Sequence, residues 1–114
     1  MRKNWLYTAA LVLGTASLAW AAPTPGNAKE GKAVYGRSCQ GCHGMDGKGS
    51  PSLAKMMHVT MLPLGSKQVQ AKSDAQLKKD IVDGIGKMPP QKSLSAKDVD
   101  DVIAYIRELG KSAK

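Results

Sequence analysis

One short run of residues, Cys39-Gln40-Gly41-Cys42-His43, has a spacing with specific chemistry. Two thiols three positions apart at a helix end can add to the two vinyl groups of one haem, and the adjacent imidazole then lies beneath the iron. The chain contains no other cysteine, so it can carry at most one covalent haem. The motif therefore predicts covalent attachment through Cys39 and Cys42, with His43 as the proximal iron ligand.

Paired cysteines can also form three different kinds of site. A structural disulfide would suit an oxidising compartment, but it gives the adjacent histidine no role. A thioredoxin-like redox pair would need strands alternating with helices, and the chain has no convincing strand run. A zinc site could draw only on Cys39, Cys42, His43 and His58. The spacings of these histidines match no zinc finger.

The beginning of the chain has the pattern of an export signal. A basic start precedes an apolar stretch over residues 6–18, and Ala19 and Ala21 supply the small residues that signal peptidase reads. A retained membrane anchor is the alternative, but the stretch is shorter than the roughly 20 residues that span a bilayer. We therefore expect residues 1–21 to be a signal peptide. Residues 22–114 would then form one periplasmic domain without stable membrane insertion.

The predicted mature domain is small and poor in large apolar side chains. It has no phenylalanine, it loses both tryptophans with the signal peptide, and its only aromatic residues are Tyr35 and Tyr105. A domain of this size is marginally stable without a further aid. A buried haem would supply the missing apolar volume.

The chain is basic. Its formal charge of +8 falls to +6 when Arg2 and Lys3 leave with the signal peptide. Such a surface can attract redox partner proteins with acidic docking surfaces, or it can serve solubility alone. Nucleic acid is excluded as a partner because the lysines are scattered and no aromatic residues lie between them. We expect the domain to act as a monomer.

Capping residues and hydrophobic periodicity predict three helices. The first follows Asn27 and runs to about residue 39. The second follows Ser73 and ends at Gly84, and the third follows Ser95 and stops at Gly110. The residues expected to face inward are Gly31, Val34, Tyr35 and Ser38 in the first, Leu77, Ile81 and Ile85 in the second, and Val99, Val102, Ile103, Ile106 and Leu109 in the third.

Several of these features resemble the class I c-type cytochromes of the small bacterial sort, over about residues 26–109. Gly31, Tyr35 and the two cysteines fall at the offsets of the family's first-helix glycine, aromatic residue and haem cysteines. The segment 102–107 is similar to the closing helix, which implies that Tyr105 packs against Gly31 and Tyr35. The resemblance implies an all-α fold of three to five helices wrapped around one covalent haem c.

The second iron ligand is inferred from the same resemblance. The segment 86–89 is similar to the family's distal-ligand loop, and prolines block helix formation there, so Met88 is implied as the distal ligand. Met61, His58 or the absence of a sixth ligand are the alternatives.

The resemblance also implies a role for Pro51, whose carbonyl would orient His43 by accepting its other ring N–H. The expected function is electron transport in the periplasm, without enzymatic activity, by a monohaem carrier with His and Met ligands. An open-site haem sensor or peroxidase-like protein is the alternative if Met88 is not bound. A second alternative is that the chain is the cytochrome subunit of a larger redox complex.

Overall fold

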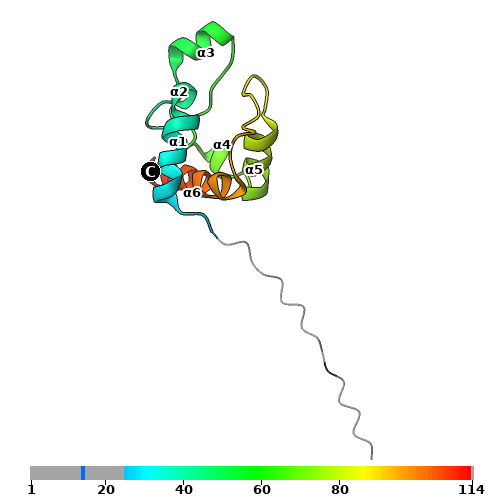
Figure 1. Ribbon diagram of the computed structural model, residues 1–114. Coiled ribbons are helices and arrows are strands. Elements are labelled where there is room, and N and C mark those ends of the chain that lie inside the picture. Colours follow the sequence, from blue (N-terminus) through cyan, green and yellow to red (C-terminus); the bar gives the residue numbers. More distant parts are fainter. Residues whose placement is uncertain (1–13, 15–24, 114) are drawn as a thin grey trace, which may run out of the picture.

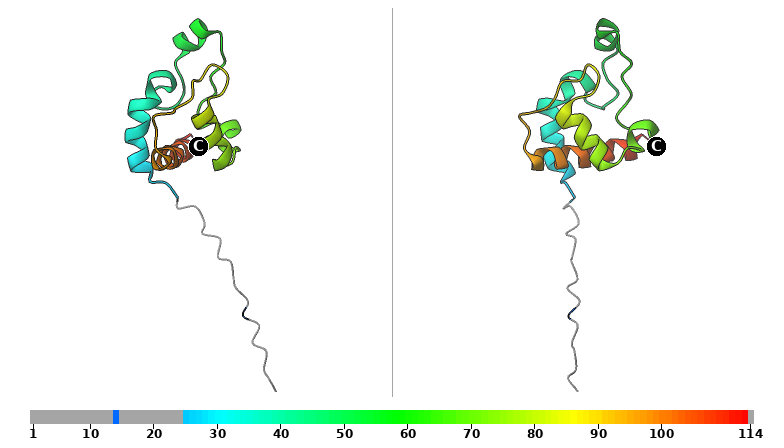
Figure 2. Two further views of the ribbon diagram at one scale, coloured as in Figure 1. Left: turned by 45° about the vertical axis from the view of Figure 1, so that its right-hand side comes forward. Right: turned by 90° about the vertical axis from the view of Figure 1, so that its right-hand side faces the viewer.

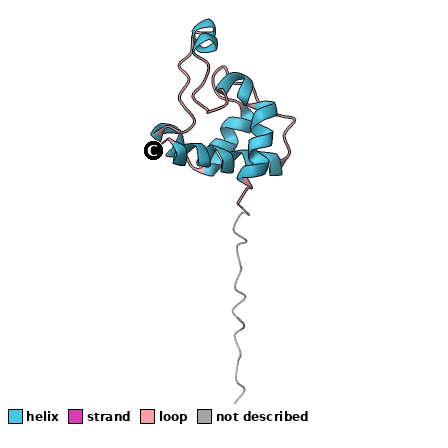
Figure 3. Ribbon diagram, turned by 90° about the vertical axis from the view of Figure 1, so that its left-hand side faces the viewer, coloured by secondary structure: helices cyan, strands magenta, loops and turns pink. Residues whose placement is uncertain are grey.

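The computed structural model describes Gly14 and residues 25–113, so the predicted signal peptide, apart from Gly14, lies outside the described residues. The described part forms helices and no strand beyond one isolated bridge (Figures 1 and 3). The helices are α1 (Ala28–Ser38), α2 (Gln40–His43), α3 (Pro51–Met57), α4 (Lys67–Gln70), α5 (Asp74–Asp83) and α6 (Ala96–Ser112). None of these helices is long and apolar enough to cross a membrane.

The all-α fold is confirmed. The described residues form six helices, one more than the expected three to five, and two of the six, α2 and α4, are single turns of four residues each. The predicted helix starts are also confirmed. The side chain of Asn27 accepts hydrogen bonds from two backbone N–H groups of α1. Ser73 with Gln76 and Ser95 with Asp98 form capping boxes at α5 and α6. These caps satisfy N–H groups that the helices themselves leave without a partner.

The first and last helices cross closely at Gly31, which the resemblance identified as the family's first-helix glycine. A Cβ atom at Gly31 would lie 1.9 Å from the carbonyl oxygen of Asp101, so no other residue fits there without displacing backbone. Beside the crossing, the rings of Tyr35 and Tyr105 pack with their centroids 5.1 Å apart. The buried core consists of Val34, Tyr35, Val69, Leu77, Ile81, Val99, Val102, Ile103 and Ile106.

The end of α5 agrees with the sequence, but the residue that follows does not. Gly84 caps the helix directly after Asp83, and Leu77 and Ile81 are buried as predicted. Ile85 is 51% exposed, so the prediction that it faces inward is wrong. The positive φ of 79° at Gly84 turns the chain out of the helix before Ile85 is reached.

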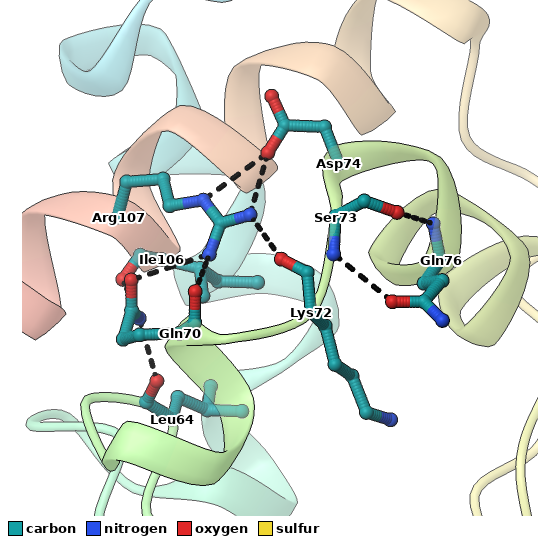
Figure 4. Close-up of polar contacts among 8 residues, drawn as sticks. All are labelled: Leu64, Gln70, Lys72, Ser73, Asp74, Gln76, Ile106 and Arg107. Carbon is teal, nitrogen blue, oxygen red and sulfur yellow. Dashed lines mark hydrogen bonds and ion pairs between the residues drawn. The ribbon is translucent and has the colours of Figure 1, made fainter.

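The predicted end of the last helix is also wrong, because α6 continues through Gly110 to Ser112. A Cβ atom at Gly110 would lie 2.4 Å from the Cδ atom of Gln70. The Gln70 amide nitrogen donates to the carbonyls of Leu64 at 2.8 Å and Ile106 at 2.9 Å (Figure 4). Gly110 therefore makes room for the Gln70 side chain and does not terminate the helix.

Arg107 ties the same helix to the short link between α4 and α5. Its guanidinium donates to the carbonyl of Gln70 at 2.9 Å and to that of Lys72 at 2.6 Å (Figure 4). It also forms an ion pair with Asp74 at 2.7 Å. One side chain thus joins α6 to the end of α4, to the link and to the start of α5.

The helices α3 and α4 were not predicted, and α3 lies far from the core. Ser50 and Ser66 cap α3 and α4, and Pro51 occupies the first turn of α3. Figures 1 and 2 place α3 at the end of the molecule remote from α6, whereas the start of α1 lies beside α6. The long segments on either side of α3 therefore project from the helical body.

Candidate functional site

Cys39 is the residue between α1 and α2, where the helical conformation is interrupted, and Cys42 lies within α2. Cys39 ends α1, and its carbonyl accepts hydrogen bonds from the N–H groups of Cys42 at 3.2 Å and His43 at 3.0 Å. Cys39 packs against the core, whereas Cys42 is exposed, and no disulfide joins them in the structure. The α2 turn thus presents both thiols and the imidazole within one short stretch.

The electrostatics of Cys39 do not suit a redox-exchange catalyst. Burial, together with the neighbouring Cys42, raises the pKa of the Cys39 thiol to about 11. Catalytic thiols of the thioredoxin type need a lowered pKa, because the thiolate is the nucleophile. The thioredoxin-like interpretation therefore has no support from this site.

The imidazole of His43 is partly buried, and its Nδ1 atom lies on the buried edge of the ring. Its Nδ1 atom has no hydrogen-bond partner among the described residues, so the expected bond to the carbonyl of Pro51 is not present in the structure. Burial lowers the pKa of the His43 imidazole, which favours the neutral ring that binds metals. Buried polar atoms in folded proteins nearly always have a partner. The other ring nitrogen, Nε2, forms no hydrogen bond with a described residue, so the neutral ring can bind a haem iron through Nε2, and these residues fit that group.

The loop that follows His43 is held at several points, one of which the sequence pattern does not predict. The carbonyl of His43 accepts a hydrogen bond from the N–H of Gly49 at 2.7 Å. The hydroxyl of Tyr35 donates to the carbonyl of Gly44 at 2.6 Å. The family resemblance pointed to the ring of Tyr35 only as a packing group. Its hydroxyl connects the core to the residue next to His43.

Met88 lies in a tight turn after α5. Ile85 and Met88 exchange backbone hydrogen bonds of 3.2 and 2.9 Å, and Gly86 between them has a positive φ of 56°. The side chain of Met88 is half-buried against the core. Next to it, the ammonium of Lys87 donates to the carbonyl of Met57 at the end of α3. In Figure 1 this yellow loop stands on the other side of the molecule from α1 and α2.

The rival ligands lie in different surroundings. A Cβ atom at Gly49 would lie 3.6 Å from the sulfur of Met61, so Met61 packs on the loop that follows His43. His58 caps the end of α3 in a left-handed conformation and is exposed. Among the described residues, no three His, Cys, Asp or Glu side chains are placed to hold a metal ion together. The four residues of the zinc alternative therefore form no such group.

Comparison with known proteins places most of the chain in a single family. The family model described as cytochrome C oxidase, cbb3-type, subunit III matches residues 26–106. The cytochrome c-554(547) of Halothiobacillus neapolitanus is 35% identical over 92 residues, which cover 74% of this chain and 98% of that protein.

Solved structures agree with these matches. The KustC0563 c-type cytochrome superposes with a TM-score of 0.60 at 26% identity, covering 69% of this chain and 95% of its own. Cytochrome cL from Hyphomicrobium denitrificans superposes with a TM-score of 0.55 at 27% identity. That match covers 70% of this chain and 45% of cytochrome cL.

Proposed function

The chain belongs to the cytochrome c family and carries one covalently bound haem c with its iron, and from that premise we propose that it is a periplasmic electron carrier whose iron is ligated by His43 and Met88. The observation that carries the proposal is the turn bearing Cys39, Cys42 and a partly buried His43, whose lowered pKa favours the neutral ring. Cys39 and Cys42 would hold the haem, which supplies one-electron iron chemistry.

Two features support Met88 as the second ligand. Its turn stands opposite the α1–α2 side of the molecule (Figure 1), as expected for a ligand that approaches from the other face. Met61 packs instead on the loop bonded to His43, and His58 is exposed at the end of α3. A thioether ligand raises the reduction potential and leaves the iron closed to substrates. The Nδ1–H of His43 needs an acceptor, and we assign that role to the carbonyl of Pro51 in the haem-bound protein.

The optical spectrum of the purified oxidised protein tests this assignment. Sulfur ligation of iron(III) gives a weak long-wavelength band, which we expect in the wild type and in the control Met61→Ala, but not in Met88→Ala. A band lost only in Met61→Ala would move the ligand to Met61. A high-spin wild type without the band would overturn the electron-carrier proposal in favour of an open-site sensor or a peroxidase-like protein.

A permanent subunit of a larger redox complex is a second candidate, because the matched family model is described as an oxidase subunit. The cytochrome c-554(547), which this chain matches over 98% of its length, is named as a cytochrome and not as a subunit, and this favours an independent carrier. The native protein should then elute from a sizing column as a monomer of the mature chain. Co-elution of its haem with a large assembly would instead favour the subunit.

The proposed partners are redox proteins that meet the projecting end of the molecule. Four large apolar side chains are strongly exposed in the described residues: Met45, Met56, Leu62 and Ile85. Lys48, Lys87 and Lys92 come from the same segments, and none of them forms an ion pair with another described residue. Exposed apolar side chains together with unpaired positive charges suit a short-lived complex with an acidic protein.

A further inference from the structure

We propose that the hydroxyl of Tyr35 is a positioning group for His43: its hydrogen bond to the carbonyl of Gly44 fixes the peptide next to the iron ligand and thereby helps to set the ring orientation and the reduction potential. This inference rests on the proposed function, in which His43 ligates the iron. It concerns one oxygen atom, because the ring of Tyr35 already has a packing role in the core.

The hydrogen bond is short and well protected. The Tyr35 hydroxyl oxygen lies 2.6 Å from the Gly44 carbonyl oxygen, and the residue is only 1% exposed. Burial is the main cause that raises the pKa of Tyr35 well above its ordinary value. The hydroxyl therefore remains protonated, and a proton donor, at neutral pH.

The acceptor sits where the backbone has little freedom to compensate. Gly44 follows His43 directly and has φ 77° and ψ 167°, a conformation that favours glycine. Its carbonyl also accepts a longer bond of 3.3 Å from the N–H of Gly47 within the same loop. In the described part of the chain, Tyr35 is the one side chain from outside residues 43–49 that donates to this loop. It thus supplies the side-chain hydrogen bond between the core and the loop that follows His43.

The electrostatic consequence has a definite sign. The hydroxyl proton partly offsets the negative end of the Gly44 carbonyl, which lies one residue from the iron ligand. Without that proton, the local potential becomes more negative and stabilises the more positive, oxidised iron. Removing the hydroxyl should therefore lower the reduction potential as well as loosen the orientation of His43.

The experiment compares Tyr35→Phe with Tyr105→Phe in the haem-loaded protein. Tyr105 is the matched control, because its ring packs against Tyr35 while its hydroxyl makes no hydrogen bond with a described residue. The readouts are the midpoint potential and the hyperfine-shifted proton NMR signals of the His43 ring and the haem methyl groups. We expect Tyr35→Phe to lower the potential and displace the signals, and Tyr105→Phe to leave both unchanged.

A second measurement covers the case in which Tyr35→Phe fails to accumulate. Residues 22–114 contain only Tyr35 and Tyr105, so 3-fluorotyrosine in the Tyr105→Phe background labels Tyr35 alone in that part of the chain. Its more acidic hydroxyl is a stronger donor, so the potential should shift upward.

Wild-type signals and potential in Tyr35→Phe, or an unmoved potential on fluorination, would overturn the positioning role. A loss of thermal stability with no other change would reduce Tyr35 to a structural residue. If the wild type shows no hyperfine-shifted signals from His43, the proposed ligation itself is wrong. That result is separate from the result for Tyr35.

Discussion

At the scale of single residues, the crossing of α1 and α6 depends on the absence of one side chain. Gly31→Ala should lower the free energy of unfolding by about 1–3 kcal/mol, because its Cβ would lie 1.9 Å from the carbonyl oxygen of Asp101 and one helix must move. Denaturation by urea measures the change. Gly36 offers a control in the same helix, since the nearest atom outside that helix's backbone lies 3.7 Å from its Cβ position.

Gly36→Ala should be neutral or stabilise the protein by up to about 1 kcal/mol, because alanine has the higher helix propensity. Equal denaturation midpoints for the two variants would contradict the claim that the crossing requires glycine at position 31.

Only part of the candidate site can be predicted from a local sequence pattern. The spacing of Cys39, Cys42 and His43 is local, so the sequence alone indicates haem attachment. The hydrogen bond from Tyr35 to Gly44 joins residues nine positions apart across the end of a helix. A tyrosine in an amphipathic pattern indicates burial, but the pattern does not say where its hydroxyl points.

At the scale of elements, α6 is joined to the link between α4 and α5 by Arg107. Arg107→Met should leave the carbonyls of Gln70 and Lys72 without this donor and cost about 1–3 kcal/mol of unfolding free energy. Arg107→Lys should rescue little, because an ammonium lacks the planar fork that reaches separate acceptors. Thermal unfolding, with hydrogen exchange of the amides in α4, measures both effects.

Lys111→Met is the matched control on the same helix, since Lys111 pairs only with Glu108 at an exposed site. Its loss should cost less than about 1 kcal/mol. A comparable loss in both variants would mean that Arg107 contributes no more than a surface charge.

The elements themselves were predictable where local signals and burial agree. The helices α1, α5 and α6 have capping residues followed by apolar positions that pack into the core. The short α3 and α4 have caps but too few residues for a periodic pattern, so the sequence does not predict them. Gly110 has the position of a helix stop, yet the close approach of Gln70 keeps it inside α6. Tertiary contacts decide between these two uses of glycine.

At the scale of the whole molecule, acidic and basic groups are paired unevenly. The six ion pairs of the described residues all join groups on α1, α5, α6 and the link before α5. Lys48 and Lys87, by contrast, lie in the loops around the candidate site and pair with no described carboxylate. The ion pairs thus lie within the helical body, whereas Lys48 and Lys87 contribute positive charge beside the candidate site that no described carboxylate offsets through an ion pair.

This distribution predicts how the position of a charge affects electron transfer to an acidic partner. Lys48→Glu should slow the bimolecular rate about two- to tenfold at low ionic strength, because Lys48 lies in the loop after His43. Lys29→Glu changes the net charge equally, but Lys29 is exposed at the start of α1, beside α6, so it should slow the rate much less. Stopped-flow kinetics over a range of salt concentrations separates the two cases, since screening should remove the difference. Equal slowing in both variants would show that net charge governs the encounter, and a rate independent of salt would exclude electrostatic steering altogether.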